Sequence, residues 1–300
     1  MKENIPHFLY SKLINDYDEE TVQKIIKGYS YVRPVTLRVN TSKTIVDEIK
    51  KELSKLNVSF KGISWYKDAL IIEKVREDFI KKLPMYENGL IYFQSLSSMI
   101  PPLVVSPKEG ESILDMAAAP GGKTTQMANL SNNKALIMAL EKNKIRAERL
   151  KYNIKKQDSK KVSVVVKDGR NLDEYFSFDK ILLDAPCSGS GTLNINDNLN
   201  ETFTEDLVNR SIKFQKELLE SAVKHLKTGG EIIYSTCSIL KEENEEVLDF
   251  IMKKYNLEII PIDEGLFSDI PLLPVNISGT ICICPTDLYE GFFVSKLRKK

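Results

Sequence analysis

Two cysteines follow apolar stretches that are typical of buried strands. Reactive side chains are often placed just beyond the end of such a strand. Cys187 follows Lys-Ile-Leu-Leu-Asp-Ala-Pro, and Cys237 follows Glu-Ile-Ile-Tyr-Ser-Thr. A lone cysteine is more often a small buried hydrophobe. Both of these residues, however, lie in turn sequences just beyond a strand, and a thiolate in such a place can act as a nucleophile. Cys187 and Cys237 are therefore candidate catalytic residues.

A third predicted strand leads into a glycine-containing turn. Residues 112–125 read Ser-Ile-Leu-Asp-Met-Ala-Ala-Ala-Pro-Gly-Gly-Lys-Thr-Thr, which predicts a strand, a tight turn and a helix that begins near Lys123. Glycines at such a turn let backbone N–H groups approach a ligand, and a helix start favours a carboxylate or phosphate. The pattern is neither a phosphate-binding loop, which has glycine where this chain has Ala117, nor the dinucleotide pattern G-x-G-x-x-G.

The elements around these turns alternate between strands and helices. Strands are predicted at 113–115, 135–140, 162–166 and 180–184, with helices from Lys123 and at 144–156. This rhythm predicts a doubly wound, Rossmann-like α/β fold, in which the carboxyl ends of the parallel strands share one ligand crevice. Glu141 and Asp168 follow the second and third strands. Each could simply cap a helix, but together with Asp115 and Asp184 they predict one acid-rimmed pocket.

The N-terminal part has a different pattern. Apolar spacing predicts helices within 7–28, a strand at 36–40, a helix over 45–56 and a strand at 69–72. We expect two domains: residues 1–88, helical plus α+β, and residues 89–300, catalytic. Arg38 and Asn40 could contact RNA or simply face outward from a half-buried strand, and Trp65 and Tyr66 could stack on a base or belong to the core.

Composition sets limits on function. Of the 300 residues, 42% are hydrophobic and 28% charged, and the net charge is only +1, so overall charge does not attract nucleic acid. The basic run over 142–161 fits a solvated helix face first and phosphate contact second. Neither a leader nor a membrane-spanning run is evident, and four cysteines suit a reducing compartment. We expect a cytoplasmic monomer without a metal site, because Cys282 and Cys284 have no second ligand pair nearby.

Three motifs carry a resemblance to a known family. Asp-Met-Ala-Ala-Ala-Pro-Gly-Gly-Lys-Thr at 115–124, Asp-Ala-Pro-Cys-Ser-Gly at 184–189 and Tyr-Ser-Thr-Cys-Ser at 234–238 resemble, in order, the signatures of the Nol1/Nop2/Sun (RsmB/NOP) RNA (cytosine-C5)-methyltransferases. The resemblance runs from about Thr36 to the C-terminus. It implies an RNA-recognition-like N-terminal domain, RNA (rRNA or tRNA) as partner and S-adenosyl-L-methionine as cofactor. The implied cofactor-binding residues are Ala117, Ala118, Ala119, Pro120, Gly121, Gly122, Lys123, Glu141, Asp168 and Asp184.

The family's chemistry gives both cysteines a role. C5 of cytosine is a poor nucleophile until a thiolate adds to C6, so covalent addition divides one difficult step into two easier ones. By resemblance, Cys237 is the nucleophile and Cys187 assists breakdown of the adduct. Asp184 could serve the base or the cofactor, and Lys123 the cytosine or the loop. The stretch 92–99 is expected beside the crevice, whereas the acids at 242–246 fit the start of a helix.

Some questions stay open at the level of sequence. After Leu193 the family often continues with a basic residue and, further on, a tryptophan, but this chain has Asn194 and Phe203, so its substrate contacts there differ. A catalytically idle RNA-binding assembly factor is the alternative function, although the intact cysteines argue against it. A methyltransferase acting on protein or a small molecule would have no use for two strand-end cysteines.

Overall fold

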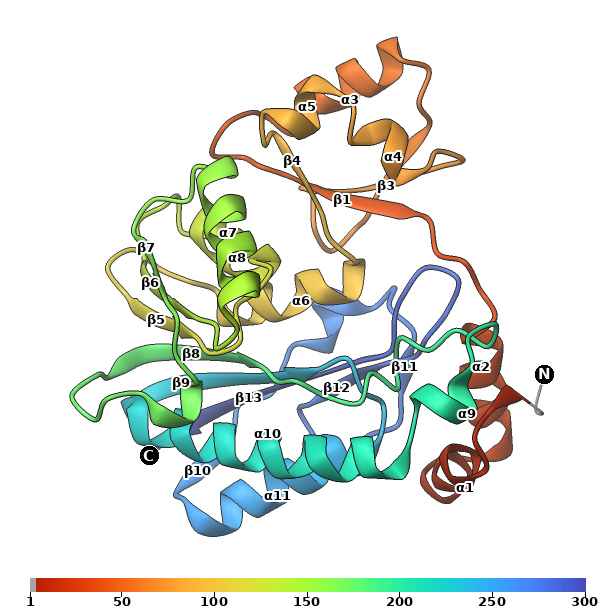
Figure 1. Cartoon of the computed structure of the whole chain (residues 1–300), viewed down its shortest axis with the longest axis vertical. Coiled ribbons are helices and arrows are strands. Elements are labelled where there is room, and N and C mark those ends of the chain that lie inside the picture. Colours follow the sequence, from red (N-terminus) through yellow and green to blue (C-terminus); the bar gives the residue numbers. More distant parts are fainter. Residues whose placement is uncertain (1–3) are drawn as a thin grey trace.

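The computed structural model describes residues 4–300; the first three residues of the predicted N-terminal domain lie outside the described part. The chain forms a nine-stranded sheet and a separate four-stranded sheet, which lies above the large one in Figure 1. Within residues 4–300, no helix combines the length and the apolar character needed to cross a membrane.

The large sheet has a parallel centre and an antiparallel edge. Its strand order is β11-β12-β13-β9-β8-β5-β6-β7, and β10 also pairs with β13. β5, β6, β7, β8 and β9 are mutually parallel, whereas β13 runs antiparallel to β9. The bounds are β5 Ser112–Asp115, β6 Leu136–Leu140, β7 Val162–Val165, β8 Phe178–Asp184, β9 Leu226–Thr236, β10 Leu257–Ile259, β11 Leu272–Leu273, β12 Ile281–Ile283 and β13 Phe292–Lys299.

Helices cover both faces of this sheet, which confirms the predicted doubly wound α/β fold (Figure 1). α6, α7 and α8 lie on one face, and α10 and α11 lie on the other. α10 illustrates why these segments are helical, because the Thr204 side chain caps its first turn by accepting from Leu207 N. The bounds are α6 Leu96–Val105, α7 Gly122–Leu130, α8 Lys144–Lys156, α9 Leu199–Thr202, α10 Glu205–His225 and α11 Glu245–Lys254, with short 3₁₀ turns η2 Gly169–Asn171, η3 Lys241–Glu243 and η4 Glu264–Phe267.

The small domain is built on the order β2-β3-β1-β4 and has its own core, which includes Leu37, Ile49 and Leu70. The bounds are β1 Val35–Val39, α3 Val46–Lys55, β2 Phe60–Gly62, β3 Ala69–Ile72, α4 Glu77–Ile80, α5 Pro84–Glu87 and β4 Ile91–Phe93. β4 pairs with β1, so the small sheet continues beyond residue 88. The division at that residue stays a prediction, and the turn there joins α5 to β4 of the small domain.

The first two helices pack elsewhere than expected. α1, His7–Asp16, and α2, Glu19–Gly28, were predicted to belong with the small α+β domain, but their apolar faces lie in the core cluster of the large sheet. The Tyr17 hydroxyl donates to the Ile239 carbonyl over 2.7 Å, and the Tyr29 hydroxyl donates to the Ser190 carbonyl over 2.7 Å. The N-terminal helices therefore support the loops that follow β8 and β9.

Two polar residues of the small domain hold it against the large one. Arg38 is fully buried, and its guanidinium donates to Gln94 Oε1 at 3.1 Å and to Thr125 Oγ1 of α7 at 3.0 Å. Asn40 donates to the Gln157 carbonyl at 2.8 Å. Because both side chains are enclosed, neither is exposed for contact with RNA.

Trp65 and Tyr66 also belong to the core. Tyr66 is buried in a cluster with residues of the large domain. Trp65 is partly buried against the same cluster, and its indole N–H donates to the Tyr289 hydroxyl at 3.1 Å.

Candidate active site

The turn between β5 and α7 forms the floor of the site. Gly121 adopts φ +108°, a left-handed conformation that favours glycine, and a Cβ at this position would come within 2.9 Å of Leu150 Cδ1. The loop carbonyls are fixed from α8, because Arg146 donates to the Ala119 carbonyl at 2.9 Å and Asn153 to the Pro120 carbonyl at 2.8 Å. The turn is thus held rigidly, as a ligand-binding loop requires.

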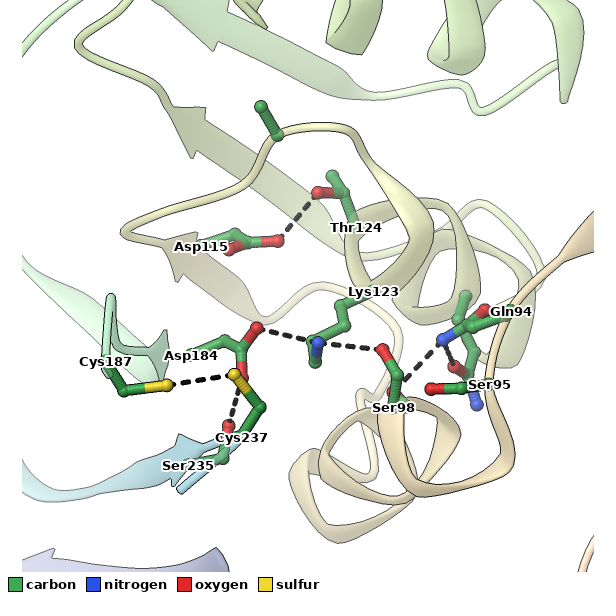
Figure 2. Close-up of polar contacts among 12 residues, drawn as sticks. Gln94, Ser95, Ser98, Asp115, Lys123, Thr124, Asp184, Cys187, Ser235 and Cys237 are labelled. Carbon is green, nitrogen blue, oxygen red and sulfur yellow. Dashed lines mark hydrogen bonds and ion pairs between the residues drawn. The ribbon is translucent and has the colours of Figure 1, made fainter. Parts of the chain in front are cut away.

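Asp115 ends β5 beneath this turn. Its carboxylate is buried and accepts a hydrogen bond from the Thr124 hydroxyl at 2.6 Å (Figure 2). Burial raises the pKa of Asp115 to about 6; the nearby charge of Asp184 adds to the increase, and the bond from Thr124 opposes it. Asp115 therefore links the end of the strand to the start of α7.

A cavity of about 240 Å³ opens beside the turn. Part of its wall comes from the stretch Tyr92–Ser98, which sequence analysis placed beside the crevice. The predicted cofactor-binding residues that line it are Ala117, Ala118, Ala119, Pro120, Gly122, Lys123 and Asp184. Gly121 does not line this cavity and instead shapes the turn.

A smaller cavity of about 30 Å³ lies next to the first, and Ala117 lines both. Glu141 and Asp168 line the smaller one, so the acids after β6 and β7 do meet at one place. Glu141 is almost wholly buried and accepts from Asn143 N at 2.8 Å. Hydrogen bonds from Arg170 lower the pKa of Asp168 and keep it ionised near neutral pH.

Lys123 and Asp184 connect the turn to the end of β8. Lys123 Nζ lies 2.7 Å from Asp184 Oδ2 and also donates to Ser98 Oγ at 2.8 Å. The other oxygen of Asp184 accepts from Ser235 Oγ of β9 at 2.8 Å. Figure 2 shows this chain of contacts running from Ser98 through Lys123 and Asp184 to Ser235, with the two cysteines beside its Asp184 end. The Asp184 carboxylate is therefore fixed in orientation while one side faces the cavity.

The two cysteines meet at the far end of that chain. Their Sγ atoms lie 2.9 Å apart, both thiols are free, and both side chains are only partly buried (Figure 2). The contact with Cys237, burial and the charge of Glu243 together hold the pKa of the Cys187 thiol well above its ordinary value. Neither cysteine lines the two cavities beside the glycine turn, and Cys237 also packs against a hydrophobic cluster, so the catalytic roles of the two thiols stay a prediction.

Several residues around the site were missed by sequence reasoning. Ser235 lies inside the Tyr-Ser-Thr-Cys-Ser motif and Ser98 inside the stretch 92–99, so both segments could be recognised from the sequence. The hydrogen-bond partner of a serine, however, cannot be predicted from its position in a motif. Glu243 was interpreted as an acid at a helix start. The structure corrects this, because α11 begins two residues later and Glu243 is fully buried. It lies beneath the two loops that contain Cys187 and Cys237, here called the cysteine loops, and it accepts hydrogen bonds from Ser188 and Ser238 of these loops.

Comparisons with known proteins identify the family. A family model described as 16S rRNA methyltransferase RsmB/F matches residues 102–298, and one described as the ferredoxin-like domain of RsmF/B-like methyltransferases matches residues 5–77. The chain belongs to the Nol1/Nop2/Sun (RsmB/NOP) family of RNA (cytosine-C5)-methyltransferases. The predicted family, enzyme class and Rossmann-like fold are thereby confirmed, as is the small N-terminal α+β domain, which the comparison describes as ferredoxin-like.

Individual Nol1/Nop2/Sun relatives differ in length and in the RNA for which they are named. The tRNA (cytosine(49)-C(5))-methyltransferase of Pyrococcus abyssi is 36% identical over 299 residues, which is 96% of each chain. The human 28S rRNA (cytosine(4447)-C(5))-methyltransferase is 34% identical over 97% of this chain, which spans 37% of that protein. A solved methyltransferase homolog from Pyrococcus horikoshii, 32% identical, superposes with a TM-score of 0.83 over 99% of this chain and all of that one.

A further solved relative is NSun6 from Pyrococcus horikoshii, crystallised with SFG. It is 26% identical and superposes with a TM-score of 0.88. The match covers all of this chain and 99% of that one.

Proposed function

We propose that this enzyme transfers a methyl group from S-adenosyl-L-methionine to C5 of a cytosine in RNA, through a covalent bond between Cys237 and C6 of the base. The observation that carries the proposal is the placement of two free thiols 2.9 Å apart at the ends of β8 and β9. Next to them, Asp184 lines the cavity beside the glycine turn. The relatives named as tRNA and rRNA cytosine-C5 methyltransferases support the same reaction.

The cavities suit the cofactor. Two neighbouring cavities that share Ala117 offer an elongated site, with acids at one end and small residues along the turn. Glu141 and Asp168 supply carboxylate oxygens for ribose hydroxyls and an adenine amine, and the backbone from Ala117 to Gly122 offers space for the methionyl part. When bound there, S-adenosyl-L-methionine supplies an electrophilic methyl group on a sulfonium.

Cys237 carries out the covalent step. Its thiolate adds to C6 of cytosine, and the electron pair of the C5–C6 bond makes C5 the nucleophile. After C5 is methylated, a base removes the C5 proton, the C5–C6 double bond re-forms and the C6–S bond breaks. Cys187, whose thiol holds its proton because its pKa is raised, is placed to protonate the departing sulfur of Cys237.

Asp184 and Lys123 orient the base. Asp184 can accept a hydrogen bond from the exocyclic amine of cytosine, while Ser235 and Lys123 keep its carboxylate from turning away. A cytosine reaches this depth only when it is unpaired or flipped out of a helix. The substrate is therefore RNA with an accessible cytosine, and both tRNA and rRNA are included in the test.

The proposal is tested by incubating the purified protein with S-adenosyl-L-methionine and transcripts of tRNA and rRNA, followed by bisulfite sequencing. We expect one or a few cytosines to become resistant to conversion in the presence of the protein. An idle assembly factor would bind RNA but leave every cytosine convertible, and that result would refute the proposed activity. A methyltransferase acting on protein or a small molecule would give the same negative result with RNA.

A further inference from the structure

A single buried carboxylate links the loops that carry the two cysteines. Glu243 Oε1 accepts from Ser188 N at 2.8 Å, and Glu243 Oε2 accepts from Ser188 Oγ at 2.5 Å. The same Oε2 accepts from Ser238 Oγ at 2.6 Å. Ser188 directly follows Cys187 and Ser238 directly follows Cys237, so one side chain is bonded to both loops immediately after the reactive residue.

The surroundings of Glu243 are built around this link. Gln215 of α10 donates both to Glu243 Oε1 at 3.0 Å and to the Pro186 carbonyl at 3.1 Å, which joins the carboxylate to the residue before Cys187. The Tyr234 hydroxyl donates to the Glu243 backbone carbonyl at 2.6 Å. Within residues 4–300, no basic side chain forms an ion pair with Glu243, so its charge is balanced by these hydrogen-bond donors.

Burying the Glu243 carboxylate costs free energy that packing alone does not require. A buried carboxylate loses its hydration, and an apolar side chain of similar volume can fill such a place with equal or greater stability. An apolar side chain, however, could not hold the two loops at a fixed separation. Three directed hydrogen bonds from the two loops and a fourth from Gln215 of α10 do fix that separation.

We propose that Glu243 is the positioning residue that holds Cys187 and Cys237 in the alignment needed for the covalent intermediate to be resolved. This inference rests on the proposed function, in which Cys237 binds the base and Cys187 helps to release it. The Glu243 carboxylate is bonded to Ser188, Ser238 and Gln215, so it acts through the loops that follow the two cysteines.

Two conservative substitutions separate position from charge. Glu243→Asp keeps the negative charge but is one methylene shorter, so the carboxylate cannot reach both loops at once. Glu243→Gln keeps the length, because its oxygen can accept from Ser188 N and Gln215 while its amide donates to the two serine hydroxyls. Glu246→Asp is the matched control, because Glu246 is exposed on the same segment and lies outside the cysteine loops.

The experiment measures methyl transfer to RNA and the covalent protein–RNA species that survives denaturing electrophoresis. We expect Glu243→Asp to lower kcat about 10- to 100-fold, as small misplacements of reacting groups do, and to leave KM for RNA and for S-adenosyl-L-methionine unchanged. The ratio of trapped adduct to methylated product should rise several-fold, since addition can occur without efficient release. Glu243→Gln should stay within about 3-fold of the unaltered enzyme, and Glu246→Asp should match it.

Different failures have different meanings. If the unaltered enzyme transfers no methyl group to RNA, the proposed function fails. If it does, but Glu243→Asp leaves kcat and the adduct ratio unchanged, the positioning role is refuted. An equal loss in Glu243→Gln would assign the effect to charge and would also refute it. Should Glu243→Asp fail to fold, Ser188→Ala and Ser238→Ala each remove one hydroxyl contact, and the same rise in adduct ratio is expected from them.

Discussion

Cys187 Sγ lies 2.9 Å from Cys237 Sγ, although the two residues are 50 positions apart in the chain. Their proximity follows from topology, because β8 and β9 are parallel neighbours and each cysteine comes just after its strand. The loops are also packed against the end of the antiparallel edge: a Cβ at Gly191 would lie 2.1 Å from the Gly291 carbonyl oxygen. Under the proposed mechanism, the two thiols act on one substrate in succession.

Cys237→Ala should abolish methyl transfer. Without the thiolate, no adduct forms at C6 and C5 stays unreactive, so the rate should fall by more than about 10³-fold, the scale seen when a covalent nucleophile is removed. Bisulfite sequencing of the reacted RNA would measure this loss. A Cys237→Ala enzyme with full activity would refute the assignment of the nucleophile.

Cys187→Ala should trap the reaction after addition. The Cys237 thiolate can still attack, but the neighbouring thiol that assists its departure is gone. A slower-migrating protein–RNA species should accumulate on denaturing gels, and treatment with ribonuclease should remove most of the shift. The double variant lacking both thiols is the control and should show no such species. If Cys187→Ala gave free product at the normal rate, its role in release would be wrong.

Asp115→Asn should change the pH dependence of stability. The pKa of Asp115 rises from 3.8 to about 6 on folding, so the folded state binds the proton more tightly and loses stability as pH rises between about 4 and 6. Above that window the loss is constant, and it amounts to at most about 3 kcal/mol. The amide variant avoids it. We therefore expect a higher Tm for Asp115→Asn at pH 7 and little difference near pH 4; a difference that did not vary with pH would contradict the cause.

Arg38→Ala should loosen the contact between the two domains. The substitution removes a fully buried side chain that donates to Gln94 and Thr125, and the free energy of unfolding should fall by about 2–5 kcal/mol. Arg149→Ala, on the exposed face of α8, should change it by less than about 0.5 kcal/mol. Urea titration monitored by circular dichroism would compare the two, and equal midpoints would show that Arg38 contributes nothing to the contact.

Much of the fold could be predicted because the relevant signals are local. The sequence pattern predicted the first and last residues of α8, and it also predicted the positions of the strands β1 and β3. Arg38 shows where this method stops. Alternation indicates that Leu37 and Arg38 point to opposite faces of β1, but it does not reveal that α7 covers the second face and buries the arginine. Which domain α1 and α2 would pack against is likewise a matter of distant contacts.

The candidate site divides in the same way. The turn at 117–123 and the acids at the ends of four strands could be found, because the ends of parallel strands converge on one crevice. Glu243 could not be found as part of this site, since an acid in a run of acids resembles a solvated helix start. Only the three-dimensional arrangement brings the cysteine loops to it.

The hairpin of α1 and α2 has a consequence for how the protein is made. Tyr17 and Tyr29 bond to carbonyls of Ile239 and Ser190, segments that a ribosome synthesises long after these helices have emerged. α1 and α2 can therefore reach their final packing only after the loops that contain Ser190 and Ile239 have been synthesised. The loops that carry the two cysteines thus gain this support only when distant parts of the chain come together.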